Sequence, residues 1–479
     1  MTSPVLMWFR RDLRLADNAA LTAAASSGGP VVPVFLCDAV LEGEGAAPRF
    51  RRGLSVEALS QALEQRGSRL ILRRGKAEEI LPALAEELGA KAVHAGRLHG
   101  PRDRANDAAV SDALTARGIA FTLHDGHTLH PPEAARTTTG GSYKVFTPFW
   151  KALRQRDPGA LLPEPARLPA PEAWPASDDL QDWALGAAMR QGAAVVQPHC
   201  HAGEAAAQDR LEAFLGRLDD YTEARDRLAD RATSGLSENL TYGEVSPRAC
   251  WHAASRALHE GGASGRGAEA FRRELVWRDF AWHLMAHAPD MATTNWRSEW
   301  DGFPWADGGP QAEAWRRGRT GMDVVDAAQR EMFVTGTMHN RARMISASYL
   351  TKHLMTDWRV GRAWFEDCLI DWDEASNAVN WQWVAGSGAD ASPFFRIFNP
   401  ETQASKFDPE GRYRRAWIAE GQENPPKGAL AYFDAIPRSW GMSATDAYPQ
   451  VPLIGTREGR ERALDAYRSR REEQGSEDG

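Results

Sequence analysis

Residues 371–400 read DWDEASNAVNWQWVAGSGADASPFFRIFNP, and this stretch is the most informative part of the chain. Three tryptophans, two aspartates and two spaced asparagines fall within 13 residues, Asp371 to Trp383. Such a mixture suits neither a plain core helix nor a solvated surface helix, because a core helix is apolar all round and a surface helix is polar on one face. We therefore expect this segment to line a functional site.

The spacing of two of these tryptophans supports that expectation. Trp381 and Trp383 are two positions apart, so on a helix their side chains point in roughly opposite directions. One indole can then face the interior while the other forms the wall of a cavity. For a single tryptophan, ordinary core packing is the better explanation, since large aromatic side chains dominate core energetics.

The bulk properties set limits on the class of protein. A chain of 479 residues exceeds the size at which one core usually keeps growing, so we expect two domains. The four cysteines are scattered without metal-ligand spacing, which argues against a zinc site, an iron–sulfur cluster or a disulfide framework, and we expect no metal. There is no long apolar run and no secretory pattern at the start, so we expect a cytoplasmic protein without a membrane span. The net charge of −8 leaves room for a local basic groove.

Residues 1–130 alternate between strand-like and helix-like segments. Short apolar runs rich in β-branched residues lie at 5–9, 31–36, 69–73, 91–95 and 119–123. Helical patterns lie between them, and those at 54–67 and 77–90 each reach a glycine that suits a helix end. This order predicts a doubly wound parallel sheet of five strands. It lacks GxGxxG, so a dinucleotide on the first strand–helix turn is not supported.

The remaining chain divides into three further parts. Residues 131–200 contain a run of prolines between Pro158 and Pro175, which predicts a connector over the surface. Residues 201–471 show a helical pattern throughout, so we expect an all-α domain. Residues 472–479 resemble a disordered tail in composition.

The segment TSGLS at 233–237 joins two predicted helices. Hydroxyl groups and backbone N–H groups at a helix start form an anion site that suits a pyrophosphate. The simpler interpretation is that Ser237 only caps its helix.

Two helices carry mixed polar and apolar side chains at helical spacing. Glu274 and Trp277 are i,i+3 neighbours and share a face with Arg278, so a carboxyl group and an indole lie together where they can hold a base. The alternative is an amphipathic helix with a Glu–Arg pair. On the other helix, Asn340 and Met344 share a face, and Arg341 points elsewhere and is free for a phosphate.

The chain resembles the photolyase/cryptochrome family, and within it the DNA photolyases that act on cyclobutane pyrimidine dimers. The similar segments are WFRRDLRLADNAAL (8–21), YKVFTPFW (143–150) and FRIFNPETQ (395–403). The resemblance implies an N-terminal α/β antenna domain over 1–130 and an all-α domain that holds FAD over 201–471. It also implies light-driven repair of pyrimidine dimers in UV-damaged DNA by reduced FADH⁻, which makes the protein a carbon–carbon lyase.

The resemblance assigns residues to three roles. The FAD-binding set comprises Tyr221, Thr233, Ser234, Gly235, Leu236, Ser237, Phe271, Arg278, Arg343, Asp371, Trp372, Asp373 and Asn377. Within it, Asp371 pairs with Arg343 and Asn377 lies against N5 of the flavin. The catalytic set comprises Glu274, Asn377 and an electron relay of Trp381, Trp358 and Trp305. The DNA-binding set comprises Arg225, Glu274, Trp277, Asn340, Arg341, Met344, Trp383, Arg396 and Gln403.

One part of the sequence departs from the family pattern. The antenna segment reads AGRLHGP at 95–101, with Gly100 where many members have glutamate. A folate, a deazaflavin, a flavin or no second chromophore all remain open.

Three alternatives to dimer repair remain. A six-four photolyase is disfavoured because it carries histidines at the positions of Asn340 and Met344. A light-sensing cryptochrome is disfavoured because plant members carry Asp and animal members Cys at the position of Asn377. A flavoprotein dehydrogenase lacks its dinucleotide fingerprint here and leaves Trp277 and Trp383 without a role. We expect a monomer whose partner is damaged DNA.

Overall fold

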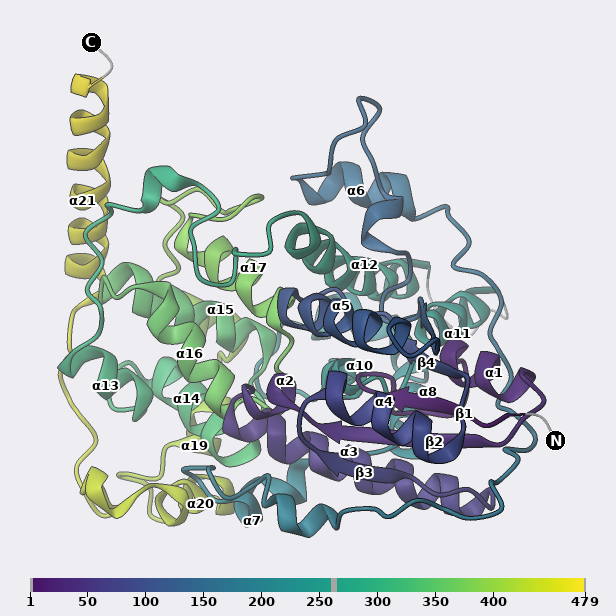
Figure 1. Cartoon of the computed structure of the whole chain (residues 1–479). Helices are drawn as coiled ribbons and strands as arrows, with labels where there is room; N and C mark the ends of the chain where they lie inside the picture. Colours follow the sequence, from purple (N-terminus) through teal and green to yellow (C-terminus); the bar gives the residue numbers. More distant parts are fainter. Residues whose placement is uncertain (1–2, 260–264, 478–479) are drawn as a thin grey trace. The chain divides into compact units, whose positions relative to one another are not determined.

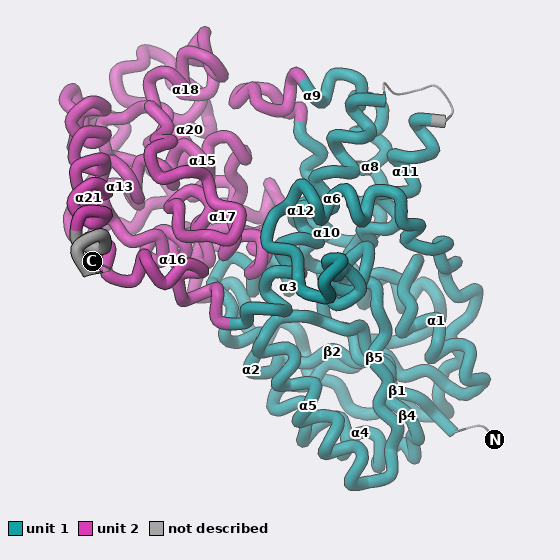
Figure 2. The backbone as a smooth tube through the Cα atoms, turned by 90° about the horizontal axis from the view of Figure 1, so that it is seen from above, with its two compact units in different colours: residues 1–186, 201–222, 233–289 teal, residues 187–200, 223–232, 290–479 magenta. Residues whose placement is uncertain are grey.

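The computed structural model describes residues 3–259 and 265–477 of the chain. It divides into two compact units, coloured separately in Figure 2. Unit 1 comprises residues 1–186, 201–222 and 233–289, and unit 2 comprises residues 187–200, 223–232 and 290–479. Each unit is described by itself below.

Unit 1 contains a parallel sheet of five strands in the order β3-β2-β1-β4-β5 (Figure 1). The strands are β1 (Val5–Phe9), β2 (Val31–Cys37), β3 (Ile71–Arg74), β4 (Ala92–Gly96) and β5 (Ala120–His124). The register pairs Val5 of β1 with Val31 of β2 and with Ala92 of β4. The strand order reverses beside β1, as in a doubly wound fold, so the expected fold class is confirmed.

The central strands are buried on both faces, which explains their continuous apolar sequence. Alternate residues of β1 enter two separate cores: Met7 and Phe9 on one face, Leu6 and Trp8 on the other. The first core is completed by α1 (Ala19–Ser26) and α3 (Ala46–Gln65), and the second by α4 (Ala77–Leu88) and α5 (Pro101–Thr115). Two helices therefore cover each face of the sheet (Figure 1).

The helices of this part end where the sequence predicts. Gly89 follows α4 with φ +65°, a left-handed conformation that glycine adopts without strain. The side chain of Asn18 accepts a hydrogen bond from the backbone N–H of Leu21 and so caps the start of α1. Asp38 caps the four-residue helix α2 (Ala39–Glu42) in the same way.

The rest of unit 1 is mainly helical and extends beyond the boundary expected at residue 130. The expected connector 131–200 contains α6 (Phe146–Leu153), short 3-10 turns and, in unit 2, α7 (Ala193–Val196). The helices after residue 200 in unit 1 are α8 (Glu204–Leu215), the first half of α9 (Tyr221–Ala224), α10 (Ser237–Tyr242), α11 (Pro247–His259) and α12 (Gly265–His287). The contacts thus group α8 to α12 with the sheet rather than with the helices that follow residue 289.

Unit 2 is helical. Its helices after residue 289 are α13 (Pro310–Arg316), α14 (Asp323–Thr335), α15 (Asn340–Ser348), α16 (Trp358–Cys368), α17 (Glu374–Ala385), α18 (Pro400–Phe407), α19 (Arg412–Trp417), α20 (Lys427–Ala435) and α21 (Thr456–Glu477). One turn of π-helix, Tyr349–His353, follows α15. A large apolar core joins α14 to α17 and contains five buried tryptophans, among them Trp315 and Trp364, with four partly buried tryptophans packed against it.

The end of the chain differs from the expectation. Residues 472–477 continue α21 as helix, where a disordered tail was expected; residues 478–479 lie outside the described residues. Charged pairs at helical spacing, such as Arg457 with Glu461, run along α21 and support helix formation in a polar sequence. Within residues 3–259 and 265–477, no helix has the length and apolar character that a membrane crossing requires.

Candidate functional site

The residues singled out from the sequence fall into two groups, one in each unit. In unit 1, the expected anion-binding loop is residues 233–237, which we call the cradle loop. Gly235 adopts φ +67° at its centre, and the backbone N–H of Leu236 donates to Oγ of Ser234 at 3.3 Å. Leu236 occupies the cap position of α10 without a side-chain cap, so the simpler interpretation of Ser237 as the cap is wrong. Gly235 and Ser237 are exposed.

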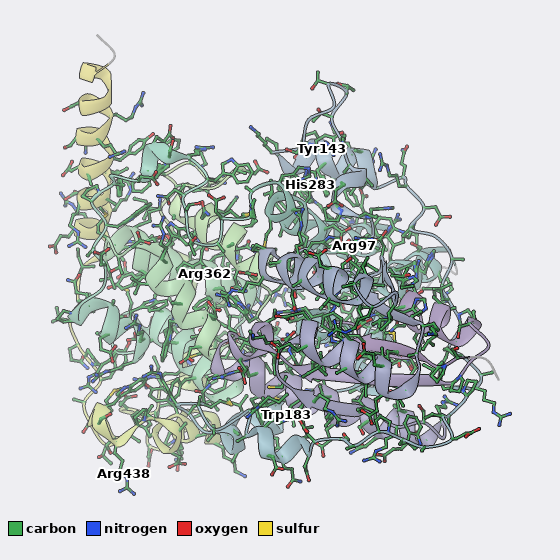
Figure 3. All side chains as sticks on the ribbon, viewed as in Figure 1. Arg97, Tyr143, Trp183, His283, Arg362 and Arg438 are labelled. Carbon is green, nitrogen blue, oxygen red and sulfur yellow. The ribbon has the colours of Figure 1, made fainter. Side chains whose placement is uncertain are left out.

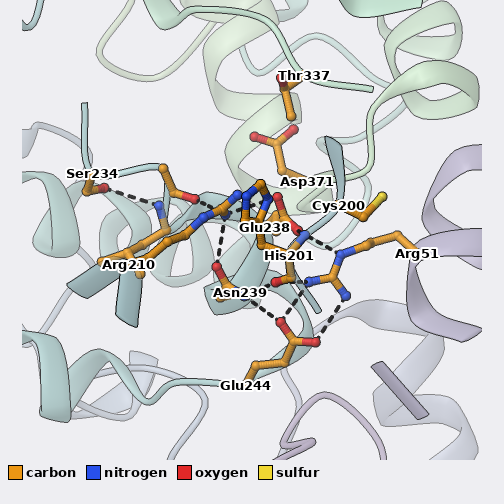
Figure 4. A network of polar contacts seen from close by, with 12 residues as sticks. Arg51, Cys200, His201, Arg210, Ser234, Glu238, Asn239, Glu244, Thr337 and Asp371 are labelled. Carbon is orange, nitrogen blue, oxygen red and sulfur yellow. Dashed lines mark hydrogen bonds and ion pairs between the residues drawn. The ribbon is translucent and has the colours of Figure 1, made fainter. Parts of the chain in front are cut away.

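Arg210 of α8 forms hydrogen bonds with the cradle loop and with the helix that follows it. Its Nη1 donates to the carbonyl oxygen of Gly235 at 2.5 Å, to Oε2 of Glu238 at 3.0 Å and to Oδ1 of Asn239 at 3.1 Å (Figure 4). One guanidinium therefore ties the loop backbone to the first turn of α10. The sequence did not single out Arg210.

A second arginine extends this network into the interior. Arg51 of α3 is fully buried; it donates through Nε to Glu238 at 2.9 Å and through both terminal nitrogens to Glu244, at 3.0 and 2.7 Å. Asn239 donates to Glu244 and to the carbonyl oxygen of His201. The carboxylates favour the charged guanidinium and raise the pKa of Arg51 above its ordinary value, against the burial that lowers it. The buried charges are thus paired and hydrogen-bonded, as burial requires.

Two expected FAD residues of unit 1 meet in an aromatic cluster. Tyr221 and Phe271 are both buried, with ring centroids 6.4 Å apart, and Phe214 of α8 lies within about 5 Å of each. The edge-to-face geometry is the arrangement that aromatic quadrupoles favour. This cluster anchors the segment that precedes the cradle loop to α12.

Three expected residues of α12 are placed differently from one another. Glu274 and Trp277 are partly exposed on the helix. Arg278 donates to the carbonyl oxygen of His127 at 2.6 Å, so it is committed to the chain before α6. The ring of Trp277 is stacked on that of Phe146, with centroids 3.5 Å apart and planes inclined by 6°. The sequence did not single out Phe146.

In unit 2, the expected pair of Arg343 and Asp371 is present. Nη2 of Arg343 donates to Oδ2 of Asp371 at 2.8 Å, and Nε donates to the carbonyl oxygen of Met338. Asp371 is buried, whereas the Arg343 side chain is 22% exposed and so has an accessible edge. Trp372 is buried and lies under the guanidinium of Arg362 at 5.2 Å.

The start of α17 orders two further expected residues. The carboxylate of Asp373 caps the helix by accepting from the backbone N–H of Ser376 at 2.8 Å. Nδ2 of Asn377 donates to the carbonyl oxygen of Asp373 at 3.0 Å. Because the amide nitrogen is engaged in this way, the amide oxygen of Asn377 is the atom left to accept a hydrogen bond from a ligand.

The three tryptophans expected in an electron relay differ in burial. Trp381 and Trp358 are buried, and Trp305 is partly exposed. Two of them are fixed through their indole N–H groups: Trp358 donates to Oδ1 of Asn295 at 2.9 Å, and Trp305 to the carbonyl oxygen of Thr351 in the π-turn at 3.1 Å.

Gly361 explains how Trp381 approaches the helix that carries Trp358. A Cβ atom on Gly361 would lie 2.1 Å from Cη2 of Trp381, so the indole packs directly on the α16 backbone. Gly361 is three positions after Trp358 on that helix, which places the two indoles on one face.

The helix α15 presents the expected Asn340 and Met344 on one face, Asn340 exposed and Met344 partly exposed. We expected Arg341 to be free for a phosphate. That expectation is wrong, because its Nη2 forms an ion pair with Asp226 at 2.8 Å. The ring nitrogen Nδ1 of His339 accepts from the N–H of Arg341 and caps the helix, and burial lowers the pKa of His339 to about 4.

The remaining expected DNA contacts of unit 2 are dispersed. Trp383 is partly exposed, in contrast to Trp381, so the prediction that the two indoles face different environments is confirmed. Arg396 is exposed, Gln403 lies on α18, and Arg225 is partly exposed in the turn that follows α9 (Tyr221–Ala224).

Unit 1 also has a cavity at the carboxyl ends of β1 and β2. In doubly wound sheets, ligands bind outside the carboxyl ends of the strands. Glu44 at its wall accepts from both Arg11 and Arg52. The other lining residues include Trp8, Arg10, Asp38, Leu98, Asp103 and Asn106.

Comparison with known proteins defines the class. Residues 5–172 match the family model described as DNA photolyase, and residues 271–469 match that of the FAD binding domain of DNA photolyase. The deoxyribodipyrimidine photo-lyase of Agrobacterium fabrum is 44% identical, with 97% of this chain and 98% of the relative covered.

Two solved structures share the fold over nearly the whole chain. A bacterial class III photolyase from Agrobacterium tumefaciens superposes with a TM-score of 0.89 at 42% identity, covering 98% of each chain. A cryptochrome from Synechocystis superposes with a TM-score of 0.84 at 29% identity, covering 97% of this chain and 99% of its own. The chain belongs to the DNA photolyase family, and it carries that family's FAD binding domain.

Proposed function

We propose that the protein repairs cyclobutane pyrimidine dimers in UV-damaged DNA with light energy absorbed by reduced FAD. The Arg343–Asp371 ion pair carries this proposal together with the oriented amide of Asn377, because these are the residues that the family resemblance assigns to the flavin ring. Full-length similarity to a deoxyribodipyrimidine photo-lyase supports the reaction class, a carbon–carbon lyase.

The residues of unit 1 suit the diphosphate end of FAD. The hydroxyls of Thr233, Ser234 and Ser237 supply neutral donors, and Gly235 leaves the loop backbone open to a close approach. Tyr221 and Phe271 fix the adjoining backbone through their ring packing. These groups bind an anion without adding a full charge beside it.

The residues of unit 2 suit a reduced isoalloxazine ring. Arg343, held by Asp371, places a positive charge where an anionic FADH⁻ gains from it. The amide oxygen of Asn377 accepts a hydrogen bond, and the oxidised ring, unlike the reduced one, offers no N–H at N5. Asn377 therefore favours the reduced state, and it functions by orientation rather than by proton transfer.

When bound, reduced FAD supplies the photochemistry: one electron passes to the dimer, two carbon–carbon bonds of the cyclobutane ring break, and the electron returns. The protein provides the lesion site. We assign Trp277 and Trp383 to stacking on the flipped dimer and Glu274, Asn340 and Met344 to its edges; damage makes such flipping cheaper. Arg225, Arg341, Arg396 and Gln403 are assigned to the DNA backbone.

Trp381, Trp358 and Trp305 are assigned to reduction of oxidised flavin from solvent. Their burial supports this, since two are enclosed and Trp305 reaches the surface. Trp381→Phe should slow photoreduction of the flavin with an external donor while sparing repair by protein reduced chemically beforehand. Equal loss of both activities contradicts the relay assignment.

A cryptochrome-type photoreceptor is the second candidate, favoured by the likeness to the Synechocystis structure. A six-four photolyase is weaker. Asn340 and Met344 replace the expected histidines, and the neighbouring His339 is engaged as the cap of α15.

For the antenna, the cavity at β1 and β2 is the candidate site in unit 1. Its arginines are already paired with carboxylates, Arg10 with Asp107 and both Arg11 and Arg52 with Glu44, so the wall does not single out an anionic chromophore. A folate, a deazaflavin, a flavin or no antenna remain the alternatives. We further propose a cytoplasmic monomer.

One preparation tests the activity. The purified, FAD-loaded and chemically reduced protein is illuminated with an oligonucleotide that carries one thymine dimer, and repair is followed by chromatography of the strand. Dark samples and a strand with a six-four lesion are the controls. We expect light-dependent loss of the dimer alone; an inert dimer strand, or repair of the six-four strand, contradicts the proposal.

The stacking assignment has its own measurement. Trp383→Ala should weaken binding of dimer DNA about 5- to 150-fold, since stacking on one aromatic ring is worth about 1–3 kcal/mol. Affinity should also fall with salt as phosphate contacts release counterions. Unchanged affinity in the variant, or a flat salt titration, counts against these residues.

A further inference from the structure

The ring of Phe146 is placed in unit 1 by its contact with Trp277 and by contacts with two residues that have no assigned role, Arg273 and Phe280. Phe146 opens α6, 131 positions before Trp277 in the chain, and its side chain is 1% exposed. Its ring is parallel to the indole of Trp277 at a centroid distance of 3.5 Å. A face-to-face contact of this kind covers one side of the indole.

Three side chains of α12 surround Phe146. The guanidinium carbon of Arg273 lies 5.2 Å from its ring centroid, and Phe280 stands edge-on to it at 5.8 Å. Phe280 is also edge-on to Trp277 at 5.8 Å. Arg273, Trp277 and Phe280 are spaced i, i+4 and i+7, so a single face of α12 forms the socket for Phe146.

The chain that carries Phe146 is tied to α12 independently of Trp277. Asp279 accepts from the backbone N–H groups of Leu129 and His130, each at 3.1 Å. His283 accepts from the N–H of Tyr143 at Nε2 and contacts the carbonyl oxygen of Pro132 through Nδ1 (Figure 3, where Tyr143 and His283 lie side by side).

The two contacts of His283 require one tautomer. A ring nitrogen that accepts carries no proton, so the proton is on Nδ1, which donates to Pro132. Burial, which lowers the pKa of His283, keeps the ring neutral. These bonds hold α6 in position whether or not an indole lies beside Phe146.

We propose that Phe146 is a positioning residue for Trp277: it covers one face of the indole and holds the ring ready to stack a lesion base on the other face. The inference rests on the proposed repair function. The physical gain is that the indole is ordered before DNA binds, because immobilising a side chain on binding costs affinity. Phe146 also leaves only one face of the Trp277 indole for stacking. A base would then stack on the indole, and the indole on the Phe146 ring.

The variant Phe146→Leu removes the ring and keeps an apolar side chain. Dimer-DNA affinity of the flavin-loaded protein, measured by fluorescence anisotropy, should fall about 2- to 12-fold, the range expected for one side chain that must be ordered on binding. Affinity for undamaged DNA, which has no flipped base, should stay the same. Phe146→Tyr should restore the dimer affinity because it restores the ring.

Phe149→Leu is the matched control. Phe149 is on the same helix and as buried, but its ring contacts among the described residues are with Tyr143, Phe280 and His283. It should lower the thermal midpoint as Phe146→Leu does, without changing the ratio of dimer to undamaged affinity. Should Phe146→Leu fail to retain flavin, Phe146→Met replaces it.

A double-mutant cycle completes the test. In a Trp277→Ala background, Phe146→Leu should have no further effect on dimer affinity, because the two residues act through one stack. If Phe146→Leu matches Phe149→Leu, or if its effect adds fully to that of Trp277→Ala, the inference is wrong. Failure of the wild-type protein to bind or repair the dimer strand overturns the proposed function instead.

Discussion

The cradle loop of unit 1 and the tryptophan-rich core of unit 2 are built on opposite principles. The cradle loop is held by charges: Arg210 and Arg51 reach a pair of carboxylates and a backbone carbonyl. The tryptophan-rich core, the apolar cluster that joins α14 to α17, is stabilised by close packing. In it the Trp381 indole contacts the backbone of α16 at Gly361. The cradle loop must point its hydrogen-bond donors in fixed directions. The tryptophans of unit 2 must instead keep fixed distances between their rings.

Breaking the charge network is expected to have the largest effect. Arg51→Met leaves Glu244 buried without its charged partner and Glu238 with Arg210 alone, and removing one member of a buried pair costs about 3–5 kcal/mol. Urea unfolding of the flavin-loaded protein in the dark measures it. Arg66→Met at the end of the same helix removes an exposed pair with Glu164 and should cost little. Equal costs contradict the network's role.

The next largest effect is expected at Arg210, the member of the network that contacts the cradle loop. Arg210→Gln removes a charged hydrogen bond to the Gly235 carbonyl, and such bonds contribute about 1.5–3 kcal/mol, so FAD affinity should fall roughly 10- to 150-fold. Flavin fluorescence on dilution gives the affinity. Arg217→Gln, exposed just beyond α8, is the control. Retained affinity in Arg210→Gln shows that the loop holds its shape unaided.

In the tryptophan-rich core, the test is to add side-chain volume where Trp381 contacts α16. Gly361→Ala forces Trp381 away from α16, and overpacking of this kind typically costs about 1–3 kcal/mol. Flavin photoreduction should slow together with the fall in thermal midpoint. Ala363→Ser, exposed on the same helix, should change neither. Normal photoreduction in Gly361→Ala would show that electron transfer through Trp381 does not depend on its packing against α16.

The last effect concerns pH. Burial raises the pKa of Glu331 from 4.5 to about 7, although Tyr413 donates to its carboxyl group at 2.5 Å. Between these values the folded chain holds a proton that the unfolded chain has lost, so stability falls as pH rises and levels off above about 7. Glu331→Gln should reduce this slope by up to about 1.4 kcal/mol per pH unit.

Thermal midpoints from pH 5 to 8 measure the slope. Asp279, whose pKa burial also raises to about 7, contributes a slope of the same sign that remains in Glu331→Gln. Glu461→Gln on exposed α21 is the control and should leave the profile unchanged. A profile identical to wild type in Glu331→Gln means that another group titrates.

The sequence predicted the sheet because its strands are buried on both faces and therefore read as unbroken apolar runs. It predicted the Arg343–Asp371 pair by family resemblance and the separation of Trp381 from Trp383 by helical spacing. Partners far apart in sequence were not predictable: Arg51 with Glu244, Arg341 with Asp226, and Phe146 with Trp277. Nothing local in an arginine or a phenylalanine indicates which distant residue it meets.

The units defined by contacts differ from the expected domains for a related reason. Residues after 200 have the helical pattern of one long domain, yet α8 to α12 pack with the sheet, since periodicity reports a helix but not its neighbours. The segment 472–477 continues α21 as far as Glu477, which its polar composition alone did not indicate.

The π-turn at Tyr349–His353 has a consequence for insertions and deletions. A π-turn holds one residue more than an α-helical turn, and its carbonyl at Thr351 accepts the indole N–H of Trp305. Deleting a single residue there would leave an ordinary α-helical turn in which the Thr351 carbonyl no longer meets the indole N–H of Trp305. We therefore expect relatives that keep the Trp305 contact to keep the number of residues at these five buried positions.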